Sequence, residues 1–79
     1  MAGDRDEVYA EKASFVENEL STMLRAATNG VVRGLSYERQ GAEEFVVVDM
    51  CTRMFDVNVT ADSLWAIAKD VMRSIAERY

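Results

Sequence analysis

The chain has 79 residues, of which 49% are hydrophobic and 29% charged, and these proportions are typical of one small folded domain rather than a disordered segment. Asp and Glu number 14 against 9 Lys and Arg, giving a net charge of −5, which argues against direct nucleic-acid binding because such binders are usually basic. The sequence has no histidine, the commonest general base. Its one cysteine, Cys51, excludes an internal disulfide and a multi-cysteine metal site.

A long amphipathic helix is predicted over residues 4–27. At 100° per residue, its apolar side chains form one stripe that consists of Tyr9, Ala13, Val16, Leu20, Met23, Leu24 and Ala27. Acidic residues at the start of the segment suit the positive end of the helix dipole. Asn29 and Gly30 follow as a stop signal of the left-handed kind, so we expect the helix to end just after Ala27.

Three strands are predicted next, over residues 31–39, 44–50 and 54–59. Turns at Gly41 and at Cys51 would connect them as an antiparallel meander. These turns, chosen independently, place one apolar set on the same face of all three strands: Leu35, Tyr37, Val46, Val48, Phe55 and Val57. We therefore expect this face to be the core face of the sheet.

The last predicted element is an amphipathic helix over residues 61–79, with Thr60 or Asp62 as the N-cap. Its apolar arc contains Leu64, Ile67, Ala68, Val71, Met72, Ile75 and Tyr79, with Trp65 at the edge. The element order α-β-β-β-α predicts a single α+β domain over residues 1–79, in which two amphipathic helices pack on one face of a three-stranded sheet as two layers. A three-layer arrangement, in which one helix covers the second sheet face, is the alternative.

The carboxylates and Cys51 are the remaining candidates for catalysis, and neither supports an enzyme. Glu43 and Glu44 are neighbours on a strand, so they point to opposite faces and cannot act as a catalytic pair. A catalytic cysteine normally needs a histidine base, which this chain lacks. We therefore expect no catalytic residue, no cofactor site and no metal site.

The element order resembles that of the double-stranded-RNA-binding domain, whose members contact RNA with lysines at the start of the last helix. Here that segment carries the acid Asp62, so the sequence does not support RNA binding and we assign no family. The longest apolar run, residues 45–48, is far shorter than the roughly 20 residues that a membrane helix needs. An unpaired cysteine is typical of a reducing compartment, and we expect a cytoplasmic protein of bacterial or phage origin.

Apolar side chains outside the predicted core point to protein–protein contacts. They are Val32, Phe45, Val47 and Met54 on the second sheet face, Val8 and Phe15 on the flank of the first helix, and Trp65 on the last helix. We expect a small acidic, non-enzymatic interaction module of unknown biological role that self-associates as a homodimer through these residues. A foreign protein partner is the alternative occupant of the same surface.

A second hypothesis starts from the acidic side chains. A row of them could imitate the phosphates of a nucleic acid: Asp4, Asp6, Glu7, Glu11, Glu43, Glu44, Asp49 and Asp56. The protein would then be an inhibitor, of the type encoded by phages or mobile elements, that binds the basic surface of a nucleic-acid-handling protein. Such binding should weaken steeply with salt, whereas an apolar self-interface should hardly respond.

Overall fold

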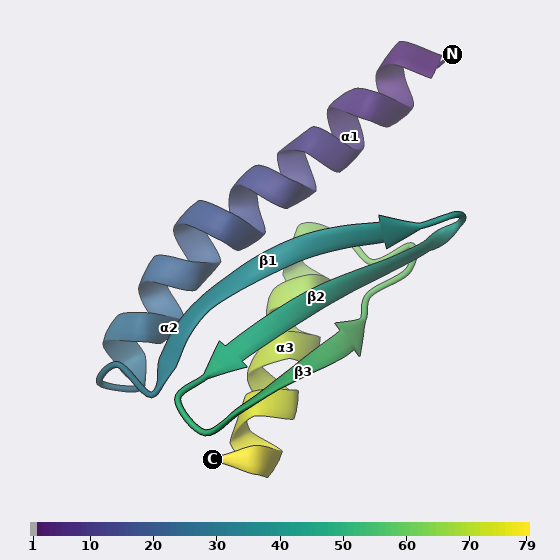
Figure 1. Ribbon diagram of the computed structural model, residues 1–79. Helices are drawn as coiled ribbons and strands as arrows, with labels where there is room; N and C mark the ends of the chain where they lie inside the picture. Colours follow the sequence, from purple (N-terminus) through teal and green to yellow (C-terminus); the bar gives the residue numbers. More distant parts are fainter. Residues whose placement is uncertain (1) are drawn as a thin grey trace.

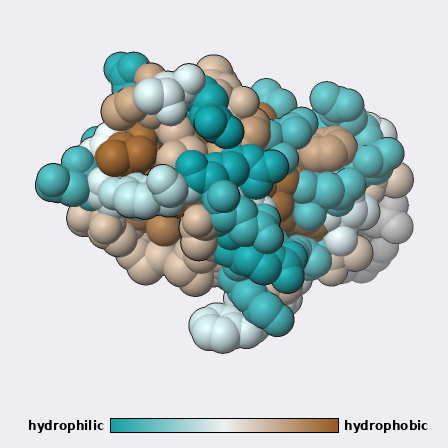
Figure 2. Space-filling view, turned by 90° about the horizontal axis from the view of Figure 1, so that it is seen from below, coloured by the Kyte–Doolittle hydropathy of each residue, from teal (hydrophilic) through white to brown (hydrophobic). Residues whose placement is uncertain are grey.

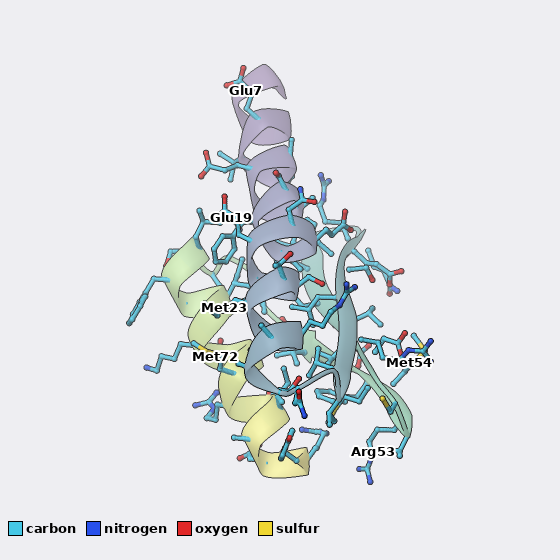
Figure 3. The ribbon with its side chains drawn as sticks, turned by 90° about the vertical axis from the view of Figure 1, so that its left-hand side faces the viewer. Glu7, Glu19, Met23, Arg53, Met54 and Met72 are labelled. Atoms are coloured by element: carbon cyan, nitrogen blue, oxygen red, sulfur yellow. The ribbon has the colours of Figure 1, made fainter. Side chains whose placement is uncertain are left out.

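The computed structural model describes the backbone of residues 2–79 and the side chains from Glu7 onward. A long helix, three strands and a final helix follow one another in the predicted order. Figures 1 and 3 show both helices on the same side of the sheet. The predicted two-layer α+β architecture is therefore confirmed, and the three-layer alternative is wrong.

The N-terminal helix is continuous but not uniform. It consists of α1 (Ala2–Ser14), a π-helical segment η1 (Phe15–Leu20) and α2 (Ser21–Ala27). A π-helical turn holds more residues than an α-helical turn, so it rotates the residues that follow it away from a straight 3.6-residue stripe. The buried positions of η1 and α2 are Val16, Leu20, Ser21 and Leu24, whereas Met23, which the regular stripe places in the core, is exposed.

The end of this helix follows the predicted stop signal. Asn29 and Gly30 both take positive φ angles, 55° and 87°, as a left-handed C-terminus requires. The buried Thr28 hydroxyl donates a hydrogen bond to the Leu24 carbonyl at 2.6 Å and accepts one from the Val32 amide at 3.0 Å. These bonds lead the chain directly from the helix into the first strand.

The sheet is an antiparallel meander of β1 (Val32–Gln40), β2 (Glu43–Met50) and β3 (Arg53–Asn58), in the order β1-β2-β3. The predicted registers are confirmed, with Tyr37 opposite Val46 and Val46 opposite Val57. Each two-residue turn preserves the alternation of side chains, so the apolar positions of all three strands face the helices.

A β-bulge at the start of β1 overturns one sequence expectation. Val32 pairs with Met50 and Gly34 pairs with Asp49, so Arg33 is an extra residue in the ladder. An extra residue reverses the alternation on one side of the bulge. Val32 is therefore 0% exposed and lies in the core, and its predicted place on the second sheet face is wrong.

The last helix, α3 (Leu64–Arg78), begins slightly later than predicted. Ser63 is its N-cap, and the Ser63 hydroxyl accepts a hydrogen bond from the Ala66 amide at 3.2 Å. Thr60, one of the two expected caps, instead accepts a hydrogen bond from the Glu44 amide at 2.9 Å and so holds the chain against β2.

The hydrophobic core lies between the two helices and the inner sheet face. Its buried members come from η1, α2, β1, β2, α3 and the segment after β3: Val16, Leu20, Leu24, Val32, Leu35, Val46, Val48, Met50, Val59, Ile67, Ala68, Val71 and Ile75. The partly buried Phe55 and Val57 of β3 pack against them. Two surfaces remain outside this core: the outer sheet face, and the side of the helix layer that points away from the sheet.

Candidate interaction surfaces

The expected interaction residues divide between two opposite surfaces. Phe45 and Val47 are half-buried and Met54 is 66% exposed on the outer sheet face. Phe15 and Trp65 instead lie together on the helix layer, where they line one groove. Figure 3 shows this division, with Met54 projecting from the sheet on the side opposite to the helices.

The groove between the N-terminal helix and α3, which we call the interhelical groove, has a volume of about 480 Å³. Its main walls are Phe15, Glu19 and Met23 from the first helix and Leu64, Trp65 and Met72 from α3. Met23 and Met72 reach toward one another from the two helices (Figure 3). Glu19 is the one ionisable side chain among the described residues that line it, so the groove is largely apolar.

A second hollow of about 410 Å³ extends the groove toward the C-terminal end of α3. It shares Met72 with the first and is also lined by Leu24, Ile75 and Tyr79. Figure 2 shows this end of the molecule from below, where hydrophobic residues appear in several patches among hydrophilic ones. The apolar surface therefore continues along the helix layer.

Exposed apolar side chains are concentrated along the interhelical groove. Of the six large hydrophobic side chains that are exposed in the described part of the chain, four lie in it or in its extension: Met23, Trp65, Met72 and Tyr79. Trp65 is the most exposed of them, at 77%. Contiguous apolar surface of this kind is uncommon on a monomer, so the groove is the main candidate for a contact surface. Val8 is also exposed, on α1.

Sequence reasoning assigned Met23, Met72 and Tyr79 to core stripes, so it missed three of the four exposed apolar side chains of the groove and its extension. A signal was nevertheless present, because both predicted apolar arcs are wider than one sheet face can cover. Methionine is also common on surfaces that adapt to a partner. A wide apolar arc with methionine at its margin therefore indicates a helix that buries one part of the arc in the core and exposes the other part as apolar surface.

The acidic residues of the second hypothesis are dispersed in the structure. Glu7 and Glu11 are exposed on α1, while Glu43, Asp49 and Asp56 belong to the sheet. The side chains of Asp4 and Asp6 lie outside the described residues. Helix and sheet acids thus form no single row.

Glu44 is not part of an acidic surface, because it is 4% exposed on the inner sheet face. One of its carboxylate oxygens accepts hydrogen bonds from the Lys12 ammonium at 2.8 Å and from the Tyr37 hydroxyl at 2.5 Å. The other oxygen accepts one from the Ala61 amide at 2.9 Å. The expectation that Glu44 presents charge to a partner is therefore wrong. Its parity with Val46 and Val48 on β2 was the signal that it points inward.

The hydrogen bonds to Glu44 decide the electrostatics of this buried cluster. Burial alone raises the pKa of Glu44, but the hydrogen bonds from Lys12, Tyr37 and Ala61 outweigh it, so the pKa lies below its usual range. Burial and the hydrogen bond to Glu44 raise the pKa of Tyr37. A lowered carboxyl pKa suits a fixed ion pair rather than a general base at neutral pH. The cluster joins α1 to the sheet and to the segment before α3.

A second carboxyl, Asp62, is partly buried where the chain enters α3. Burial raises its pKa, and the neighbouring carboxyl of Asp70 raises it further. Asp62 Oδ2 is buried and has no hydrogen-bond partner among the described residues. Arg73 lies 3.1 Å from Asp70 and balances the charge of Asp70.

The remaining chemical candidates lie apart from one another. Cys51 is exposed in the turn between β2 and β3, and its thiol lies 3.4 Å from the Gly30 carbonyl oxygen. Within the described ranges, no three Cys, Asp or Glu side chains are grouped so that they could hold a metal ion. No helix, over the residues that the structure describes, has the length and apolar character needed to span a bilayer.

Comparison of the chain with protein-family models, with curated proteins and with solved structures finds no significant match.

Proposed function

We propose that this protein is a non-enzymatic interaction module that forms a homodimer through the interhelical groove. The observation that carries the proposal is the concentration of exposed Met23, Trp65 and Met72 along one groove of about 480 Å³. Aromatic and methionine side chains of this kind are enriched in the buried centres of protein interfaces. Trp65, the only tryptophan, would be the main anchor.

A second copy of the chain suits this groove better than a charged partner does. In a two-fold symmetric dimer the same patch meets itself, so the patch must tolerate its own charge. Within the described lining the groove carries one acid, Glu19, near one end, and so little repulsion would oppose self-contact. Two such helix layers placed face to face would bury their apolar side chains in a four-helix contact.

Tryptophan fluorescence tests the proposal without a label. Because Trp65 is 77% exposed in the single chain, dimer formation should shift its emission to shorter wavelength and protect it from a soluble quencher such as acrylamide. Both effects should disappear on dilution, and the Met72→Asp variant should lack them at every concentration because a buried unpaired charge is costly.

The matched control is Met54→Asp, which introduces the same charge at an exposed methionine on the outer sheet face. It should retain the concentration-dependent emission shift. A Trp65 emission that is independent of concentration in the unmodified chain would contradict the proposal. So would a shift that Met54→Asp abolishes and Met72→Asp leaves intact, because the sheet face would then be the interface.

A further inference from the structure

We propose that the outer sheet face, opposite to the interhelical groove, binds a basic segment of a partner protein, in which arginine or lysine flanks an apolar side chain. The proposal goes beyond homodimer formation and does not depend on it. A dimer built through the helix layer would leave both sheet faces open.

The strand registers give the layout of this face. Across the three strands, one row consists of Ser36, Val47 and Asp56. The neighbouring row on one side consists of Gly34, Asp49 and Met54, and the row on the other side consists of Glu38, Phe45 and Asn58. Phe45, Val47 and Met54 therefore form an oblique apolar stripe with carboxylates on both sides.

The charge on this face has one sign. Its four charged register positions, all among the described residues, are acidic: Glu38, Glu43, Asp49 and Asp56. Arg33 borders the face at the β-bulge. A second copy placed face to face would bring acid against acid, and a nucleic acid would be repelled. The complementary occupant is therefore a basic polypeptide.

Three of these carboxylates serve no visible purpose in the fold. Within the described part of the chain, Glu38, Asp49 and Asp56 accept no side-chain hydrogen bond and form no ion pair. Glu43 lies 3.5 Å from the Asn58 amide. Charges beside an apolar stripe that the fold does not use can bind a partner without disturbing the structure.

The surface of this face is hollowed on both sides of Val47 and Met54. One hollow of about 270 Å³ is also lined by Gly34 and has Asp49 at its edge. The other, of about 290 Å³, has Asp56 at its edge. An arginine stem could pack on the apolar stripe while its guanidinium reaches either carboxylate.

A defined peptide probe tests this inference on the full chain. The probe is a fluorescein-labelled peptide that alternates arginine with leucine, and its binding is measured by fluorescence anisotropy at several salt concentrations. We expect binding that weakens with salt, and weaker binding of a peptide in which serine replaces leucine. Equal binding of a peptide in which glutamate replaces arginine would overturn the proposal, as would no binding of the arginine peptide at low salt.

Charge-reversal variants locate the site. The double variant Asp49→Lys/Asp56→Lys should weaken binding about tenfold, since it replaces two attractive exposed contacts by two repulsive ones. The control double variant Glu7→Lys/Glu11→Lys makes the same change in net charge on α1 and should alter binding less than about twofold. Circular dichroism establishes that each variant is folded. Equal weakening by both variants, or none by the sheet variant, would overturn the proposal.

Discussion

Removal of the Lys12 ammonium should destabilise the protein more than removal of any exposed cation. In Lys12→Met the apolar stem is retained, and the Glu44 carboxylate stays buried without its charge partner. The two side chains of this pair are only 10% and 6% exposed. Breaking a buried ion pair costs about 3–5 kcal/mol. Because Tyr37 and Ala61 still donate to Glu44, we expect a cost of about 2–3 kcal/mol.

Urea denaturation followed by circular dichroism measures this cost. The control is Arg73→Met, which breaks a pair whose side chains are 64% and 27% exposed and should cost less than about 1 kcal/mol. The double variant Lys12→Met/Glu44→Gln should be more stable than Lys12→Met, because it leaves no buried charge: the glutamine oxygen can accept from the Ala61 amide while its amino group donates to the Tyr37 hydroxyl. Equal midpoints for Lys12→Met and Arg73→Met would refute the reasoning.

Three further predictions concern pH and packing. Asp62→Asn should stabilise the protein by about 1 kcal/mol at neutral pH by urea denaturation, because it ends the repulsion from Asp70; a loss of stability would contradict this. The gain should vanish in acid, because a carboxyl with a raised pKa takes up its proton as the pH falls and no longer repels. Glu44 should show the opposite pH dependence, because its pKa is lowered in the folded protein. Its contribution to stability is complete above the ordinary carboxyl pKa and is lost as the pH falls below it. The urea midpoint of Glu44→Gln should therefore fall less steeply in acid than that of the unmodified chain. Ile67→Ala should cost about 2–5 kcal/mol, whereas Met23→Ala, at the groove, should cost less than about 1 kcal/mol; similar midpoints would contradict the placement of the core.

The strands and their registers could be predicted because local rules determine them. Alternation along β2 and β3, with two short turns, leaves one register that places all the apolar positions on a single face. The same parity places Glu44 inward. Sequence reasoning treated it as surface charge because its cation, Lys12, is 32 residues away and could be matched to it only in three dimensions.

The errors arose where the backbone departs from ideal periodicity. The β-bulge at Arg33 moved Val32 into the core, and the π-helical segment rotated Met23 out of it. The π-helical segment contains no glycine or proline, whereas the bulge lies directly before Gly34, and this glycine inside a strand was a signal that the strand prediction did not use. Phe15 and Trp65 were each identified as exposed apolar residues, but that they share one groove follows from helix packing, which no local pattern encodes.

Molar mass by light scattering after gel filtration tests the central claim most directly. We expect the unmodified chain to have twice the monomer mass at both low and high salt, because an apolar interface is insensitive to ionic strength. Met72→Asp should have the monomer mass, and Met54→Asp should remain a dimer. A monomer mass for the unmodified chain at every concentration, or a dimer that only Met54→Asp dissociates, would contradict the account.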